Sequence, residues 1–211
     1  MKVYLGQTRQ NPLNGLAAEC SRLGFGEMTT RKELPPRRFP YAFDNGAFGD
    51  YLAKRPFQGD RYLFALERLW ILPTPDFLVV PDLVAGGPAS ISFSESWRPR
   101  VEGFAPLYLA VQDGMEGKQV EEVIQHYNGL FVGGSVPWKL ATAVEWVKQA
   151  HAHGKPCHIG RVGTGIRAVW ARWTGCDSID STVPLWAERN FRAFVNGLTQ
   201  AVPFLREKEH G

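Results

Sequence analysis

Short, nearly continuous hydrophobic runs alternate along this chain with longer segments in which apolar residues recur every three or four positions. The runs FLVV and LYLAV show no polar alternation, which is typical of parallel strands that are covered on both faces. The pattern predicts strands at Lys2–Leu5, Glu27–Thr30, Tyr41–Asp44, Phe77–Pro81, Leu107–Gln112, Gly129–Val132, Cys157–Gly160 and Ser178–Asp180.

Helical periodicity fills most of the gaps between these strands, and it is clearest in DRYLFALERLWIL. Ser135 and Pro137 predict the start of one helix and Gly154 its end, because a serine cap, an early proline and a terminal glycine are typical of helix ends. The segment 24–40 is the least regular part. The predicted helices are Leu13–Leu23, Asp60–Leu72, Gly117–Tyr127, Trp138–His153, Ile166–Thr174 and Trp186–Ala201.

Strands interleaved with helices in this way predict an α/β fold, a compact (β/α)8 TIM-like barrel. With 211 residues the chain stands near the lower end of the barrel's range of roughly 200 to over 400 residues. We therefore expect one domain over residues 1–211 with short loops. A seven-stranded or open α/β sheet is the structural alternative.

Composition and charge change this picture little. The net charge of +3 gives no strong basic field, although basic residues could still gather on one face. The 3 cysteines are widely spaced and fit neither a disulfide framework nor a zinc site, and no spacing indicates a metal or another cofactor. No apolar run approaches the roughly 20 residues that span a membrane. A reduced, cytoplasmic protein without a membrane partner is expected.

The candidate chemistry lies where the predicted strands end. Asp44, Asp180 and Gln112 are the last residues of three predicted strands, and Asp82 directly follows a fourth. Each has a structural alternative when taken alone, such as a turn at Asp44 or a helix cap at Asp82. Active-site residues of barrels come from the carboxyl ends of the strands. Because these polar residues share that end, the sequence predicts one active site built from three carboxylates and an amide.

Other polar residues are less informative. His158 lies within a predicted strand and is expected to be a satisfied core histidine. Gly163, in the segment RVGTG before a predicted helix, belongs to a turn of the kind that binds anions. Arg161 begins the same segment.

Five segments resemble the tRNA-guanine transglycosylases, over about residues 40–185. FDNGAF is similar to that family's motif around a catalytic aspartate, and VVPD to its base-reading aspartate. AVQDG, GLFVGG and RVGTG with CDSIDST resemble its later motifs in the same order. The resemblance implies a barrel enzyme that exchanges a base in a nucleic acid.

The resemblance also implies a role for each residue. Asp180 would attack C1′ of the nucleotide and form a covalent glycosyl-enzyme intermediate. Asp44 would be the general base that takes a proton from the incoming base. Asp82 would accept hydrogen bonds from the N1–H and the exocyclic amine of a guanine-like base. The remaining substrate-binding residues would be Gln112, the backbone N–H groups of Gly129 and Leu130, Arg161 and Gly163.

One departure concerns the polymer. The zinc-binding segment that helps the tRNA enzymes grip tRNA is absent after Asp180. This favours the compact DNA-guanine transglycosylases of phages and bacteria. The expected partners are then guanine-containing DNA and a free 7-deazaguanine base such as preQ0. A phage-encoded protein would act in the host cytoplasm. The oligomeric state is left open.

Basic residues on the late helices are expected to hold the phosphates, namely Lys139, Arg167, Arg172, Arg189 and Arg192. A second basic cluster, with Arg31, Lys32, Arg37 and Arg38, is a candidate DNA-contacting arm. Three other functions stay open: a transglycosylase acting on RNA, a glycoside or nucleoside hydrolase using two carboxylates, and a non-catalytic nucleic-acid-binding barrel.

Overall fold

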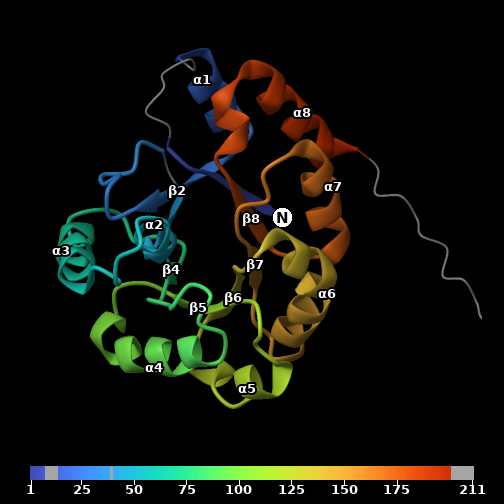
Figure 1. Cartoon of the computed structure of the whole chain (residues 1–211). Coiled ribbons are helices and arrows are strands. Elements are labelled where there is room, and N and C mark those ends of the chain that lie inside the picture. Colours follow the sequence, from blue (N-terminus) through green and yellow to red (C-terminus); the bar gives the residue numbers. More distant parts are fainter. Residues whose placement is uncertain (8–13, 39, 201–211) are drawn as a thin grey trace, which may run out of the picture.

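The computed structural model describes residues 1–7, 14–38 and 40–200 and shows a closed barrel of parallel strands (Figure 1). Each strand pairs with the next along the chain, and β8 pairs with β1 from Lys2 opposite Ser178 to Leu5 opposite Ser181. The predicted (β/α)8 barrel is thereby confirmed, and the open and seven-stranded alternatives are excluded. The strands are β1 Lys2–Leu5, β2 Gly26–Thr30, β3 Tyr41–Asp44, β4 Leu78–Val79, β5 Leu107–Val111, β6 Gly129–Val132, β7 Cys157–Ile159 and β8 Ser178–Ser181.

Helices surround the barrel on its outside (Figure 1). They are α1 Asn14–Arg22, α2 Ala47–Leu52, α3 Gly59–Leu69, α4 Ala89–Val101, α5 Gly117–Glu121, α6 Val136–Ala152, α7 Gly165–Thr174 and α8 Glu188–Thr199. Two short 3₁₀ helices span Ile124–His126 and Val183–Trp186. The sequence did not predict α2 and α4. Two predicted helix ends, Leu13 and Ala201, lie outside the described residues.

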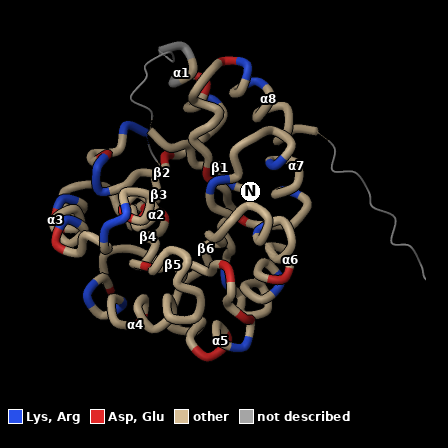
Figure 2. The backbone as a smooth tube through the Cα atoms, in the orientation of Figure 1, with Lys and Arg blue, Asp and Glu red and all other residues tan. Residues whose placement is uncertain are grey.

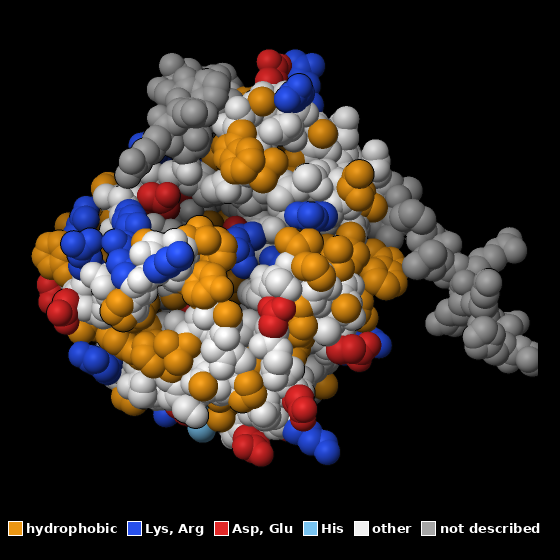
Figure 3. Space-filling view, viewed as in Figure 1, with side chains coloured by type: hydrophobic (Ala, Val, Ile, Leu, Met, Phe, Trp, Pro, Cys, Tyr) orange, Lys and Arg blue, Asp and Glu red, His pale blue; other side chains and the backbone are white. Residues whose placement is uncertain are grey.

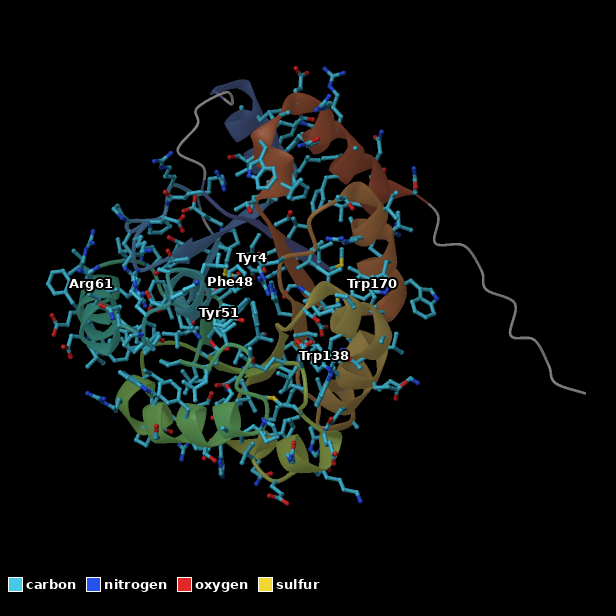
Figure 4. All side chains as sticks on the ribbon, in the orientation of Figure 1. Tyr4, Phe48, Tyr51, Arg61, Trp138 and Trp170 are labelled. Carbon is cyan, nitrogen blue, oxygen red and sulfur yellow. The ribbon has the colours of Figure 1, made fainter. Side chains whose placement is uncertain are left out.

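Two hydrophobic layers hold the barrel together. The larger lies between the strands and the helices, while the smaller fills the barrel itself. Inside the barrel the rings of Phe77 and Tyr108 stack at 4.2 Å, and Phe77 meets Tyr4 edge to face at 5.6 Å. Figure 4 shows Tyr4 near the centre of the view. A filled interior of this kind leaves the two ends of the barrel as the places for chemistry.

Among the described residues, no helix is long and apolar enough to cross a membrane. The cysteines, Cys20, Cys157 and Cys176, are buried free thiols. Burial raises the pKa of Cys176 to about 12, so this thiol is protonated at neutral pH.

Candidate active site at the carboxyl end of the barrel

The three aspartates meet at the carboxyl end of the barrel, which we call the mouth. Side chains alternate along a strand, and Asp44 stands two positions after the interior residue Ala42. Asp180 pairs in register with Tyr4, another interior residue. Asp82 follows β4, and Asp44 is the group linked to both of the others, because the charges of Asp180 and Asp82 raise the pKa of Asp44. The structure thus brings the predicted carboxylates together.

Two amide side chains hold Asp82. Asn45 donates from Nδ2 to Oδ1 of Asp82 at 2.8 Å and to the carbonyl of Val80 at the same distance. Its own Oδ1 accepts the backbone N–H of Ala47 at 2.7 Å. Gln112 donates from Nε2 to Oδ2 of Asp82 at 3.3 Å. Both carboxylate oxygens therefore have fixed donors on the protein side, and each keeps lone-pair capacity for a ligand.

Gln112 is itself fully engaged by the loop that follows β4. Its Nε2 also donates to the carbonyl of Leu83 at 2.8 Å and to Oγ of Ser90 at 2.9 Å. Its Oε1 accepts the backbone N–H of Ala85 at 2.6 Å. The side chain is only 3% exposed. We therefore assign Gln112 a positioning role, in which it fixes the loop that carries Asp82, in place of the predicted direct contact with a base carbonyl.

Serines on the inner face of α4 complete this support. Ser94 donates to the carbonyl of Pro81 at 2.9 Å, directly before Asp82. Ser90 accepts the N–H of Leu83 at 3.0 Å. Both serines are fully buried. Sequence reasoning missed them because a run with serines at core positions has no hydrophobic period, yet the spacing of four residues does place them on one helix face.

Asp44 and Asp82 have unusual proton affinities for carboxyl groups. Burial raises the pKa of Asp44 to about 7, helped by the neighbouring carboxylates and opposed by the N–H of Gly46, which donates to Oδ1 at 2.6 Å. Burial raises the pKa of Asp82 to about 6, opposed by Asn45. At neutral pH, Asp44 can therefore give or take a proton, while Asp82 is mostly ionised.

Asp180 is held by a buried histidine. Nε2 of His158 lies 3.0 Å from Oδ1 of Asp180, and Nδ1 lies 2.8 Å from Oγ of Ser178. The backbone N–H of Arg161 also donates to Oδ1, at 3.0 Å. The two contacts made to Asp180 fall on one oxygen of its carboxylate, and the ring of His158 stacks on Phe131 at 4.9 Å. As expected, His158 is a buried histidine whose ring nitrogens both have hydrogen-bond partners. One of those partners is Asp180, the predicted nucleophile.

Arg161 spans the mouth from β7 to α2. Its backbone is left-handed, with φ of 54°, a strained conformation for a residue other than glycine. In this conformation the backbone N–H of Arg161 donates to Asp180, and the side chain donates to the carbonyl of Gly134 at 2.9 Å. The guanidinium lies 3.9 Å from the centre of the Phe48 ring. Figure 4 shows Phe48 close to Tyr51 on α2. Arg161 is thus well placed to touch a ligand.

A glycine makes room for this arrangement. A Cβ on Gly160 would lie 2.5 Å from Cζ of Phe131 and 3.5 Å from Oδ1 of Asp180. Any larger residue would push the Phe131 ring off the imidazole of His158. Because Gly160 has no side chain, the Phe131 ring can stack on His158, which contacts Asp180. Gly160 also accepts a hydrogen bond from Nζ of Lys139 on α6.

Gly129 and Leu130 do not lie at the mouth. They begin β6, whose carboxyl end is Val132, so they are at the opposite end of the barrel from the aspartates. The N–H of Leu130 donates to the carbonyl of Pro156 at 3.0 Å within the barrel wall. The predicted base contact is therefore wrong. The mouth instead contains Gly133 and Gly134, which follow the same strand.

Gly163 lies close to Asp180 on the neighbouring strand turn. It is left-handed, with φ of 84°, and its carbonyl accepts from Oγ of Ser181 at 3.0 Å. That bond fixes the turn before α7. The structure thus places Gly163 beside Asp180, the predicted nucleophile, without adding a direct indication of an anion.

The predicted phosphate contacts divide into buried and exposed residues. Lys139 is only 3% exposed, so it is not on a surface groove, and burial with the nearby Arg161 lowers its pKa to about 8. Arg167 lines a small cleft with Lys139 and Arg161 between α6 and α7. Arg172 donates to the carbonyl of Gln200.

The other two predicted contacts lie on α8. Arg189 is exposed. Arg192 is also exposed, and it pairs with Glu188. These late-helix residues therefore do not form one continuous basic face.

The basic cluster after β2 is partly structural. Arg31 forms a buried ion pair with Asp50, and Arg38 pairs with the buried Glu27 at 3.5 Å. Lys32 and Arg37 are exposed. Figure 2 shows Lys and Arg gathered around β2, α2 and α3 on the left of the view.

Among the described residues, no group of three or more His, Cys, Asp or Glu side chains could hold a metal ion. The sequence matches no model of a known protein family and no curated protein at a significant level.

Proposed function

We propose that this protein is a DNA-guanine transglycosylase, which exchanges a guanine in DNA for a free 7-deazaguanine base through a covalent intermediate on Asp180. The observation that carries the proposal is the different environment of each aspartate at one mouth. Asp180 is held at one oxygen, Asp44 has a pKa of about 7, and Asp82 is held by two amides. Three such carboxylates match the three tasks of the reaction.

Asp82 is proposed to read the base. At neutral pH its carboxylate is mostly ionised, and guanine offers two adjacent donors, the N1–H and the exocyclic amine. The amides of Asn45 and Gln112 orient the carboxylate by holding it from the protein side. A base without both donors leaves an acceptor unpaired in a buried site, which gives strong discrimination.

Asp180 and Asp44 are proposed to carry out the exchange in two steps. In the first, the free oxygen of Asp180 forms a bond to C1′ while the bond from C1′ to N9 breaks, and protonated Asp44 gives its proton to N9. Guanine leaves as a neutral base. In the second, ionised Asp44 takes the N9 proton of the incoming base, N9 forms the bond to C1′, and the bond to Asp180 breaks. Asp44 ends each cycle in its starting state.

The target nucleotide must be turned out of the stack to place C1′ beside Asp180. Arg161 and Phe48 lie against each other beside the mouth, and we propose that they contact the turned-out nucleotide. The motif resemblance to the tRNA-guanine transglycosylases supports the same assignment of roles.

The test is to incubate the protein with guanine-containing DNA and a mass-tagged 7-deazaguanine, and then to analyse the nucleosides. Tag in the DNA with the wild type, and none with Asp180→Asn, would support the proposal. Parallel reactions with tRNA distinguish an enzyme acting on RNA. Release of base without incorporation of the tag would indicate a hydrolase. If the folded protein does neither in any nucleic acid, the proposal is wrong.

A further inference from the structure

A group of exposed aromatic and basic side chains forms a continuous surface at one side of the mouth. We call it the mouth ledge and define it as Lys32, Phe48, Tyr51, Lys54 and Arg161. Phe48 and Tyr51 are 37% and 50% exposed although both are large and aromatic. Their rings stack, with centroids 6.4 Å apart and planes 24° from parallel. An exposed aromatic pair next to a polar cavity is typical of a binding surface.

One cation of the ledge contacts this aromatic pair, and the other two belong to segments beside it. Arg161 lies with its guanidinium 3.9 Å from the Phe48 ring centre. Nζ of Lys32 would be 3.8 Å from a Cβ on Gly49, the residue after Phe48. Lys54 follows α2 directly and is exposed. Figure 3 shows hydrophobic side chains with Lys and Arg around them beside a hollow in this face.

The two lysines of the ledge form no ion pair with any described residue, whereas the charge of Arg161 also acts on the nearby carboxylates of Asp44 and Asp82. The segment 47–55 contains a single acid, Asp50, which is 1% exposed and is neutralised by Arg31 and Arg55. Asp50 cannot therefore balance the lysines at the surface. A partner that suits the ledge must carry negative charge and flat apolar faces.

We propose that the mouth ledge binds single-stranded DNA, with a base stacked on Phe48 and Tyr51 and the flanking phosphates against Lys32, Lys54 and Arg161. Nucleic acids combine phosphates with aromatic faces, and an exposed aromatic side chain can stack only on a base that is unpaired. This proposal rests on the proposed function for the choice of DNA. It places the bound strand beside the aspartates, so that one nucleotide can enter the mouth while its neighbour is held outside.

The experiment measures fluorescence anisotropy of the whole protein with a labelled single-stranded DNA of about 15 nucleotides and with its duplex. We expect tighter binding to the single strand. Tyr51→Ala should weaken this binding about 5- to 150-fold, the usual range for loss of one stacked base. Changing Lys32 and Lys54 to Glu should weaken it further and flatten its dependence on salt between about 50 and 200 mM.

The matched control is Lys148→Glu. Lys148 is exposed near the end of α6, far along the helix from the mouth, and its charge change equals that of each single lysine change in the ledge. It should leave binding unchanged. Melting curves of each variant confirm that it is folded, since all of these side chains are exposed.

The proposal is wrong if the wild type does not bind single-stranded DNA, or if the Tyr51 and lysine variants bind it as tightly as the wild type does. It is also wrong if a polyglutamate peptide competes as well as unlabelled single-stranded DNA, or if RNA of the same sequence binds more tightly than the DNA. Failure of the proposed function is seen separately. It would leave DNA binding intact but give no base exchange and no difference between the wild type and Asp180→Asn.

Discussion

The imidazole of His158 is hydrogen-bonded to the carboxylate of Asp180, with 3.0 Å between Nε2 and Oδ1, and it is fully buried. Burial lowers the pKa of His158, and the Asp180 carboxylate opposes this shift. A neutral ring that donates from Nε2 leaves Nδ1 to accept from the hydroxyl of Ser178. The structure therefore orients Asp180 through a two-step relay, from serine to histidine to carboxylate.

Loss of this relay should slow the covalent step. We expect His158→Gln to slow formation of the Asp180 adduct about 10- to 100-fold, because a hydrogen bond to a charged group contributes about 1.5–3 kcal/mol. Single-turnover kinetics would measure the rate, and DNA affinity should not change. Ser178→Ala keeps the contact between His158 and Asp180 and should have a smaller effect. Equal adduct rates in wild type and His158→Gln would contradict a positioning role.

The raised pKa of Asp44 makes the stability of the fold depend on pH. Its folded pKa of about 7 lies above the ordinary aspartate value of 3.8, so the contribution of this group is most favourable at low pH and is lost as pH rises through 7. Asp44→Asn should therefore raise the free energy of unfolding by about 1–3 kcal/mol at pH 8 and by much less at pH 4. Urea unfolding at both pH values measures this. A variant equally stabilised at both would show that the carboxyl is not desolvated.

Asp82 should control the choice of base. With DNA that contains hypoxanthine in place of guanine, which lacks the exocyclic amine, the wild type should react far more slowly. Asp82→Asn presents an amide to the same donors, and its preference for guanine should fall by about 100-fold or more. Competition between the two DNAs gives the ratio directly. A preserved preference would mean that another group reads the base.

The packing around Gly160 is expected to tolerate no side chain. A Cβ there would lie 2.5 Å from Cζ of Phe131, and we expect Gly160→Ala to destabilise the fold by about 1–3 kcal/mol. Gly49 is a matched control, because its Cβ would meet only Nζ of Lys32, at 3.8 Å. Gly49→Ala in α2 should instead stabilise by about 0.5–1 kcal/mol. Thermal melts of both variants would show whether the signs differ.

The strands and the aspartates could be predicted from sequence because their signals are local. A hydrophobic run such as LYLAV can form little other than a covered strand, and β5 is found at Leu107–Val111. Asp44 is the last residue of β3 and Asp180 the second-last of β8, where the alternation of side chains turns them inward. The closed barrel followed from the number and order of these elements.

The errors have equally physical causes. The motif resemblance points to Gly129 and Leu130, whereas the strand-end rule that locates the aspartates points to Gly133 and Gly134. A phosphate contact by Lys139 requires a surface position, but this residue is buried. It stands four positions before Ala143 on the buried stripe of α6, a spacing that the sequence does contain.

The role of His158 depends on a contact between two strands, which no local pattern specifies. The hydrogen bonds from Gln112 to the loop after β4 are not specified by a local pattern either, because they join segments about thirty residues apart. Such contacts decide which polar residues touch a ligand and which hold the others in place.

The central claim is the covalent intermediate on Asp180, and trapping it is the most direct test. The protein is incubated with guanine-containing DNA without an incoming base and analysed on a denaturing gel, with mass spectrometry of the shifted band. We expect a protein–DNA adduct at Asp180 in the wild type and none in Asp180→Asn. The control is Asp177→Asn, which changes an exposed carboxylate just before β8 and should keep the adduct. Guanine release with no adduct, or an adduct that survives Asp180→Asn, would contradict this claim.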